Sequence, residues 1–285
     1  RKLIKEQKID AIFLITDPRY FEWLFQMENE IRKQTPIIYL NIWDDYPAPM
    51  YNKAYYESCD LLMGISKQTV NINKLVLGEK AANKIIDYVP HGMNPKLFYP
   101  INKDSKEYPE IKKLRKNIAR EGEAKFVLFF NSRNIRRKSI PDTLLAWKYF
   151  VDQLSEEEAK SCYFILHTDA VSDAGTDLPK VKDYLFGKGY NNVMLSTSKV
   201  SAEHLNQYYN IADAQILLSS AEGWGLALTE ALLTGTPIIA NVTGGMQDQM
   251  RFEDENGDWV EFDADIPSNH TGAYKKHGKW AFPIF

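Results

Sequence analysis

The stretch AQILLSSAEGWGLALTEALLTGTPIIA, residues 214–240, decides the fold of this chain. Its first seven residues are mostly apolar and end in two serines, which predicts a buried strand. A Gly-Trp-Gly turn follows, and residues 226–234 form a helical stretch that Gly235 and Pro237 bring to an end. Residues 236–240, TPIIA, are a second short apolar strand. The order strand, helix, strand indicates a parallel sheet.

The same alternation extends on both sides of this stretch. We expect further strands at residues 11–16, 36–43, 61–66, 85–90, 125–132, 162–168 and 192–196. We expect helices between them at residues 19–33, 67–77, 142–154, 179–186 and 202–211. Continuous apolar strands that alternate with helices favour parallel sheets covered on both faces.

A charged break divides the alternating pattern into two sets. Pro100 and Pro109 flank this break, and the strands resume near residue 125. The sequence therefore predicts an α/β protein with two Rossmann-like parallel-sheet domains, at residues 1–105 and 123–285. Residues 106–122 are expected to link them.

Composition and cysteine usage limit the class of protein. The chain has 285 residues, of which 44% are hydrophobic and 26% charged, as in ordinary water-soluble globular proteins. Cys59 and Cys162 lie far apart, so we expect buried free thiols in a reducing compartment and a cytoplasmic protein. The first residues, from Arg1 on, resemble the middle of a fold, so we expect an N-terminal part to be missing.

Positive charge is concentrated in residues 101–140, although the whole chain has a net charge of −3. A short basic segment in an acidic chain favours a local anion site over a nucleic-acid track. For residues 103–120, however, we expect a solvated, lysine-rich linker helix.

Glu222 and Glu230 flank the turn and the helix of the opening stretch. The unpaired N–H groups of the first helical turn, near Gly225, form a site for an anion. Ligands of open α/β sheets bind at the carboxyl ends of the strands, so Glu222 is expected at the mouth of a ligand crevice. Carboxylates accept hydrogen bonds from vicinal hydroxyls, which suits sugars. Alone, the two glutamates favour the alternative that Glu222 is a loop charge and Glu230 a solvated helix residue.

A second group of charges follows the predicted strand at residues 125–132. Arg133 and Lys138 lie in its exit loop, also at a carboxyl end. An arginine fork and a lysine point charge can together hold a diphosphate. Arg136 and Arg137 are treated as solvated neighbours.

These residues together resemble a known family. AEGWGLALTEALLTGTPIIA is similar to the E-x7-E signature of retaining glycosyltransferases with the GT-B fold, in particular glycosyltransferase family 4. The Gly-Gly pair in TGTPIIANVTGG, the Arg-x4-Lys pair and the segment VPHGMNPKLFYP at residues 89–100 also match that family. The resemblance covers residues 36–250 or so and implies that residues 1–105 are the C-terminal part of an incomplete acceptor-side domain.

The resemblance implies a role for each matched residue. Glu230 would hold the ribose hydroxyls, Arg133 and Lys138 would neutralise the diphosphate, and Glu222 would hold the donor sugar. The backbone of Trp224, Gly225 and Leu226 would assist Glu222, and Ser198 and Val200 would lie near the base. On the acceptor side, Asp44 and Asp45 follow a predicted strand, so either could line the cleft, and a loop-capping role is equally expected. His91 also follows a strand and is a candidate, with a histidine bonded to local backbone as the alternative. His167 has the same ambiguity.

The reaction implied is transfer of a hexose from a nucleoside-diphosphate sugar, most simply a UDP- or GDP-sugar, with retention and without a metal or other cofactor. The acceptor would be a glycan, a lipid-linked molecule or another acceptor, with peripheral membrane contact left open and no nucleic acid involved. The DAD triplet at residues 263–265 is a feature of metal-dependent glycosyltransferases, but the two-domain organisation argues against that interpretation, and short acidic loops are common.

The chain departs from the family pattern in places. Asn131 and Ser132 stand where members often carry a glycine, and LHTDA at residues 166–170 replaces a glycine-containing strand exit. Two alternatives of related fold stay open: an epimerase or phosphorylase, and a non-catalytic nucleotide-sugar-binding protein. An NAD-dependent enzyme is disfavoured because Gly223 and Gly225 are followed by no third glycine of the dinucleotide-binding motif.

Overall fold

The structure is a computed structural model that describes residues 2–119, 122–260 and 272–285. The chain divides into two compact units. The first unit comprises Arg1–His91, Ala221–Trp224 and Val242–Lys276, and the second comprises Gly92–Ser220, Gly225–Asn241 and His277–Phe285.

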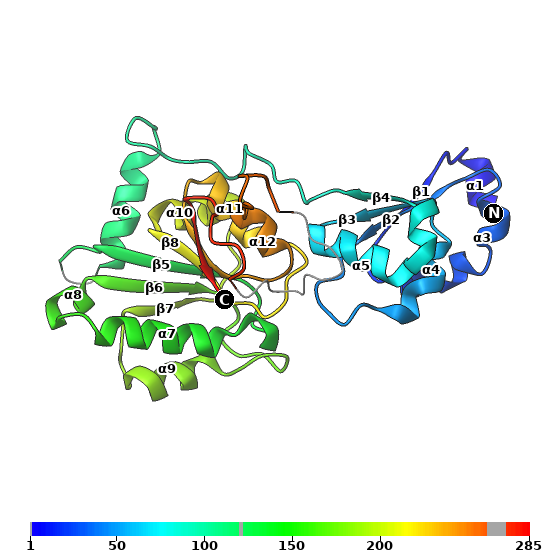
Figure 1. Cartoon of the computed structure of the whole chain (residues 1–285). Coiled ribbons are helices and arrows are strands. Elements are labelled where there is room, and N and C mark those ends of the chain that lie inside the picture. Colours follow the sequence, from blue (N-terminus) through cyan, green and yellow to red (C-terminus); the bar gives the residue numbers. More distant parts are fainter. Residues whose placement is uncertain (1, 120–121, 261–271) are drawn as a thin grey trace. The chain divides into compact units, whose positions relative to one another are not determined.

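The first unit contains a four-stranded parallel sheet with the strand order β1-β2-β3-β4 (Figure 1). Its strands are β1 (Ile12–Ile15), β2 (Ile37–Asn41), β3 (Leu61–Gly64) and β4 (Ile85–Tyr88). Its helices are α1 (Lys2–Glu6), η1 (Pro18–Phe21), α2 (Glu22–Phe25), α3 (Glu28–Ile31), η2 (Met50–Asn52), α4 (Lys53–Glu57), α5 (Lys67–Leu77), η3 (Gly78–Asn83) and α12 (Gly244–Met250).

One face of this sheet forms the core of the unit. Leu14, Tyr39 and Leu62 point into a buried cluster that α4 and α5 help to cover, and Figure 1 shows both helices on one side of the strands. On the other face, Phe13 of β1 is in register with Ile38 of β2, and the same row continues to Ile85 of β4. Phe13 is 51% exposed and Ile85 is 67% exposed. Among the described residues, the expected second cover is therefore not found on this sheet.

The single helix expected at residues 19–33 is divided into η1, α2 and α3. Asp17 caps η1 by accepting a hydrogen bond from the Arg19 N–H, and Pro18 occupies the first turn. Phe21 and Met27 then take φ angles of −110° and −114°, outside the helical range, so the chain restarts its helix at each of them.

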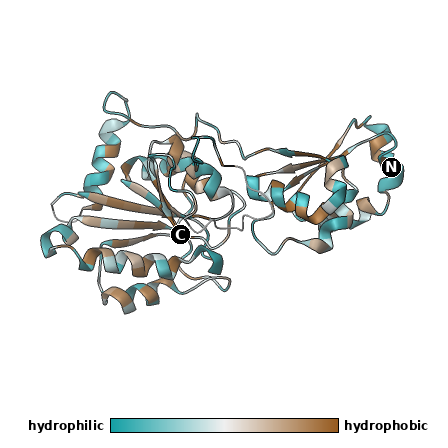
Figure 2. Cartoon of the chain, in the orientation of Figure 1, coloured by the Kyte–Doolittle hydropathy of each residue, from teal (hydrophilic) through white to brown (hydrophobic). Residues whose placement is uncertain are grey.

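The second unit contains a six-stranded parallel sheet with the order β10-β9-β8-β5-β6-β7. Its strands are β5 (Phe126–Asn131), β6 (Cys162–His167), β7 (Val193–Ser196), β8 (Ala214–Leu217), β9 (Ile238–Asn241) and β10 (Ala281–Ile284). Its helices are α6 (Tyr108–Ile118), η4 (Arg136–Lys138), α7 (Ile140–Asp152), α8 (Glu156–Lys160), α9 (Leu178–Phe186), α10 (Ala202–Ile211) and α11 (Leu226–Leu233). Figure 1 shows α7 and α9 on one side of this sheet and α10 and α11 on the other, and Figure 2 shows the strands between them as hydrophobic stripes.

Residues 92–105 belong to the second unit. The Tyr99 N–H donates to the Asn206 side chain at 3.0 Å, and the Ile101 N–H donates to the Asn210 side chain at 2.6 Å. These bonds tie residues 99–101 to α10, which explains why the second unit begins at Gly92 rather than after residue 105.

The basic helix α6 is anchored to the second unit rather than free in solvent. Ile111 and Ile118 are buried, and the Arg115 guanidinium donates to both carboxylate oxygens of Asp213 at 3.1 and 2.7 Å. The expected helix is present, but the expectation that it is a solvated linker is wrong for these side chains. Lys112, Lys113 and Lys116 are exposed and line a groove beside it.

The C-terminal strand β10 was not expected from the sequence. It pairs in parallel with β9, as its Ala281 aligns with Ile238. Pro283 lies within β10, and proline is tolerated there because β10 is an edge strand.

Both cysteines are free and buried, as expected. In the described ranges, no helix is both long enough and apolar enough to cross a bilayer.

Candidate functional site

The carboxyl ends of the second unit's strands form the candidate site. All six strands are parallel, so β5 ends at Asn131, β6 at His167 and β7 at Ser196 along one edge of the sheet. This edge is where open α/β sheets bind ligands. The residues predicted for donor binding in this unit lie in the loops after β5 and β7 and at α11, which follows β8.

Glu230 on α11 is held by two donors that the sequence did not reveal. The Tyr209 hydroxyl donates to Glu230 Oε2 at 2.6 Å, and Asn131 Nδ2 donates to the same oxygen at 3.2 Å. Asn131 Nδ2 also lies 2.9 Å from the Tyr209 hydroxyl, which closes a triangle of contacts. Glu230 is half-buried, so the alternative of a solvated helix residue is wrong.

Burial sets the protonation behaviour of this group. Burial raises the pKa of the Glu230 carboxyl, and the hydrogen bonds from Tyr209 and Asn131 lower that pKa in part. Burial and the neighbouring carboxylate raise the pKa of Tyr209 well above its usual value, so its hydroxyl remains a donor. The site thus holds a partly desolvated carboxylate whose Oε2 is already engaged.

Arg133 and Lys138 follow β5 in one short loop. Arg133 is exposed, and its guanidinium makes no hydrogen bond with any residue that the structure describes. Lys138 ends η4 and is only 7% exposed. Asn131, which contacts Glu230, is separated from Arg133 by one residue. The end of β5 therefore carries both a contact to Glu230 and the start of the loop that bears Arg133 and Lys138.

Asn134 fixes the shape of this loop. Its side-chain amide donates to the carbonyls of Asp169 at 3.0 Å and Thr176 at 2.7 Å, and its oxygen accepts from the Thr176 N–H at 3.1 Å. Asn134 is buried, and these three bonds join the loop after β5 to the loop after β6. Sequence reasoning missed Asn134, since an asparagine in a polar loop carries no distinguishing signal.

The same loop is also tied to the loop after β8. The Arg137 carbonyl accepts from the Ser219 hydroxyl at 3.0 Å and from the Ser220 N–H at 2.8 Å. Asn241 at the end of β9 donates to the Ser219 carbonyl at 3.2 Å. The exits of β5, β8 and β9 are therefore connected by hydrogen bonds.

Gly225 begins α11 in a conformation that suits glycine. Its φ of 86° and ψ of 64° are left-handed, and no side chain caps the helix at this residue. Leu226, the first helical residue, is 45% exposed. The expected anion site at this helix terminus stays a prediction.

Ser198 and Val200 lie in the loop after β7, where Ser198 is exposed and Val200 is half-buried. His167 at the end of β6 pairs with the Ser196 hydroxyl through Nδ1 at 3.0 Å, and burial lowers the pKa of this histidine. The hydrogen bond with Ser196 joins the ends of β6 and β7, which gives His167 a structural role.

Glu222 and Trp224 belong to the first unit and contact α12 there. The Gly245 N–H donates to the Glu222 carbonyl at 3.0 Å, and the Gln249 side chain donates to the Trp224 carbonyl at 2.6 Å. A β-carbon at Gly245 would lie 2.3 Å from the Gly223 carbonyl oxygen. The Gly-Gly pair therefore lets two backbones approach closely, and Glu222 is buried.

Asp44 and His91 also belong to the first unit, after β2 and β4. Asp44 is half-buried. His91 makes no hydrogen bond among the described residues, so the expected bond to local backbone is not found. Burial lowers the pKa of His91, which favours its neutral form.

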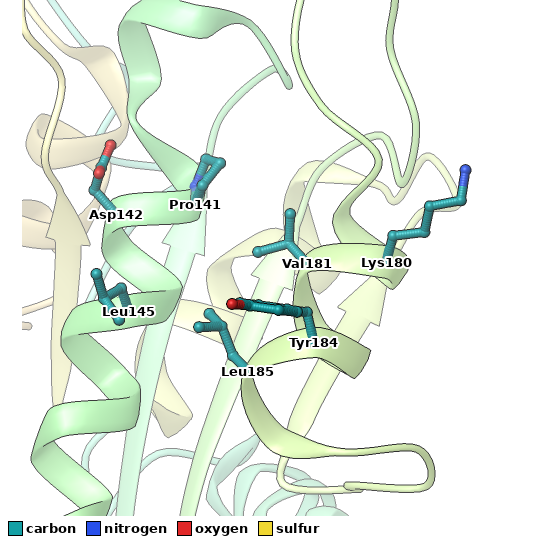
Figure 3. A pocket seen from close by; sticks show the side chains of 7 residues that line it. All are labelled: Pro141, Asp142, Leu145, Lys180, Val181, Tyr184 and Leu185. Atoms are coloured by element: carbon teal, nitrogen blue, oxygen red, sulfur yellow. The ribbon is translucent and has the colours of Figure 1, made fainter.

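A further cavity in the second unit lies between α7 and α9. The cavity has a volume of about 360 Å³. Figure 3 shows Leu145 of α7 facing Val181, Tyr184 and Leu185 of α9. No residue predicted for donor or acceptor binding lines it. The DAD triplet at residues 263–265 lies outside the described residues.

Comparison with known proteins places this geometry in a family. Residues 110–266 match the family described as glycosyl transferases group 1. The chain belongs to this family. As a group 1 glycosyl transferase it is 24% identical to mannosylfructose-phosphate synthase of Agrobacterium fabrum over 191 residues, which are 67% of this chain and 39% of that protein.

A second relative of this group 1 chain is D-inositol 3-phosphate glycosyltransferase of Geodermatophilus obscurus, 30% identical over 127 residues. That match covers 44% of this chain and 28% of the relative. The chain thus spans well under half the length of both relatives.

Solved structures share the fold of this group 1 chain. HepE of Anabaena, solved with UDP and glucose, superposes with a TM-score of 0.65 at 18% identity, covering 87% of this chain and 63% of HepE. The catalytic domain of starch synthase IV from Arabidopsis thaliana gives a TM-score of 0.63 at 15% identity, covering 94% and 62% of the two chains. The expected GT-B fold, with two parallel-sheet α/β domains, is confirmed.

Proposed function

We propose that this chain is a retaining family 4 glycosyltransferase that moves a hexose from a nucleoside-diphosphate sugar to a glycan, lipid-linked or other acceptor without a metal. The observation that carries the proposal is the Glu230 carboxylate, fixed by Tyr209 and by Asn131 at the end of β5, with the exposed Arg133 two residues after Asn131. A partly desolvated acceptor and a cation at one edge of the sheet suit the ribose and diphosphate of a nucleotide.

Each predicted residue has a distinct role in this proposal. Glu230 accepts the ribose hydroxyls, and Arg133 and Lys138 neutralise the diphosphate. Glu222 and the backbone of residues 224–226 hold the donor sugar, and Ser198 and Val200 lie near the base. Asp44 and His91 are kept as acceptor-side residues.

The transfer breaks the bond between the anomeric carbon and the diphosphate oxygen. The electron pair leaves with the diphosphate, whose growing charge Arg133 and Lys138 stabilise. The acceptor oxygen bonds to the anomeric carbon on the face that the diphosphate leaves, and its proton passes to the diphosphate. Charge stabilisation by side chains serves the role that a metal has in other sugar transfers, so no metal is required.

The names of the relatives support a sugar-nucleotide donor. HepE was solved with UDP, and starch synthase IV with ADP and acarbose. UDP- and GDP-sugars are the donors we test first, with ADP-sugars included. The free, buried cysteines support a reducing compartment, and a cytoplasmic location with peripheral membrane contact stays a prediction.

Two other functions of the same fold are distinguished by their products. An epimerase or phosphorylase would convert or phosphorolyse the sugar, and a non-catalytic relative would bind the nucleotide sugar without turnover. Product analysis with a panel of acceptors separates these outcomes from sugar transfer.

Two variants test the role assignments. We expect Glu230→Ala to weaken nucleotide binding, and Lys138→Ala to depress turnover by about 10²–10³-fold, more than it weakens binding. Arg136→Ala, which removes an exposed neighbour from the same loop, is the matched control. If both variants transferred sugar like the parent, the roles would be wrong.

A further inference from the structure

Tyr209 is held rigidly before any ligand arrives. It is fully buried, its ring packs edge-on against Phe129 at 5.0 Å between centroids, and its carbonyl accepts from the Thr236 hydroxyl at 2.8 Å. Phe98 packs against another edge of the ring at 6.0 Å. The direction of the Tyr209 hydroxyl is therefore set by packing and not by the carboxylate it meets.

Asn131 supplies the second fixed donor. It is the last residue of β5, and the register of β5 with β6 places it beside His167. Its amide nitrogen contacts both the Tyr209 hydroxyl and Glu230 Oε2. Glycine, which family members often carry near this position, has no side chain that could make these contacts.

The two donors converge on a single carboxylate oxygen. Oε2 of Glu230 accepts from Tyr209 at 2.6 Å and from Asn131 at 3.2 Å, and Oε1 accepts nothing from the described residues. A carboxylate with one oxygen fixed in this way has a defined plane and one oxygen available for a ligand.

We propose that Tyr209 and Asn131 are positioning residues that hold the Glu230 carboxylate so that its Oε1 selects ligands with ribose hydroxyls. This inference rests on the proposed function, because it assumes that Glu230 meets a nucleotide. It adds that ribose selection depends on two residues that do not touch the ligand. It also gives a role to Asn131, which stands where family members often carry a glycine.

The arrangement has a consequence for pH. The ionised carboxylate is the acceptor of ribose hydroxyls, so ribose selection is lost as pH falls through the pKa of Glu230. Burial raises that pKa, and the bonds from Tyr209 and Asn131 lower it. Of the described residues, the titratable group that contacts Glu230 is Tyr209, which stays protonated, and Asn131 is neutral. Removing either donor therefore moves the loss of ribose selection to higher pH.

The test compares binding of a ribonucleoside diphosphate with binding of its 2′,3′-dideoxy counterpart. UDP is the first probe and GDP the second, measured by calorimetry between pH 5 and pH 8. We expect the parent to prefer the ribonucleotide by about tenfold or more, the scale of a hydrogen bond to a charged group. Glu230→Ala should remove the preference. Tyr209→Phe and Asn131→Gly should each reduce it severalfold and shift its loss to higher pH.

A matched control and a ligand-free measurement complete the design. Tyr163→Phe removes a hydroxyl from another buried tyrosine, near the opposite end of β6, and should leave the preference unchanged. In the absence of nucleotide, carbon-13 NMR of the Glu230 carboxyl should titrate at higher pH in Tyr209→Phe than in the parent.

The outcomes separate this inference from the proposed function. If Glu230→Ala lost the ribose preference while Tyr209→Phe and Asn131→Gly kept it at every pH, the positioning role would be wrong and the ribose role would stand. If Glu230→Ala kept the preference, or neither probe bound the parent, the ribose role and the positioning role would both be wrong.

Discussion

A β-carbon at Gly175 would lie 2.1 Å from the Oδ1 atom of Asn134. The loop after β6 therefore approaches the loop after β5 as closely as glycine permits. Arg133 directly precedes Asn134. The contact with Gly175 therefore helps to fix the position of Arg133, the residue predicted to bind the diphosphate.

Gly175→Ala should displace the loop that carries Arg133. Overpacking of this kind costs about 1–3 kcal/mol, and Asn134 would lose bonds that satisfy its buried amide. We expect a lower melting temperature and weaker binding of a nucleoside diphosphate. Gly92→Ala is the control, since a β-carbon at Gly92 meets nothing within 4 Å. Equal binding by Gly175→Ala and the parent would show that the loop contact does not matter.

Gly245→Ala should act on the sugar rather than on the nucleotide. Its β-carbon would overlap the Gly223 carbonyl and push on the segment that carries Glu222. We expect sugar transfer to fall about tenfold or more, while affinity for the free nucleoside diphosphate is retained. Steady-state kinetics and calorimetry measure the two quantities. A loss of nucleotide affinity equal to the loss of transfer would contradict the assignment of this segment to the sugar.

Arg115→Met should destabilise the second unit. Arg115 donates to the carbonyls of Ala124 and Ile211 as well as to Asp213. These groups are partly exposed, so we expect a loss of about 1–3 kcal/mol in the free energy of unfolding, measured with urea. Lys112→Met on the exposed side of α6 should change it by less than about 0.5 kcal/mol. Equal stabilities for the two variants would mean that α6 is only a linker.

The thiols should react slowly in the folded protein. Burial raises the pKa of Cys59 to about 12 and also raises that of Cys162. The thiolate is the nucleophile, and very little of it forms at pH 8. We expect alkylation by iodoacetamide to be slow in buffer and fast in urea, followed by mass spectrometry. Rapid labelling of Cys59 in buffer at pH 8 would contradict its burial.

The sequence predicted most of the sheet strands because their signal is local. Residues 61–66 and 162–168, for example, are short apolar runs that became β3 and β6. β10 was not predicted, because Pro283 and the polar residues before the strand weaken its sequence signal, and the strand depends on pairing with β9. α12 escaped because its Gly244 and Gly245 weaken any helical pattern.

The candidate site was predictable in its charges but not in its supports. Glu230, Arg133 and Lys138 are recognisable from motif spacing along the chain. The partners of Glu230 are not, because Asn131 is 99 residues away and Tyr209 is 21 residues away in sequence. Only the fold brings these donors together, and the burial that raises the pKa of Glu230 depends on the same packing.

The proposed function depends on a diphosphate bound at the carboxyl end of β5, and one comparison tests it directly. Calorimetry of UDP and UMP, or of GDP and GMP, should be run on the parent and on Arg133→Met. We predict that the parent binds the diphosphate at least about tenfold tighter than the monophosphate, and that Arg133→Met loses most of this difference. Equal affinities of the parent for the two nucleotides, or an unchanged difference in Arg133→Met, would contradict the account.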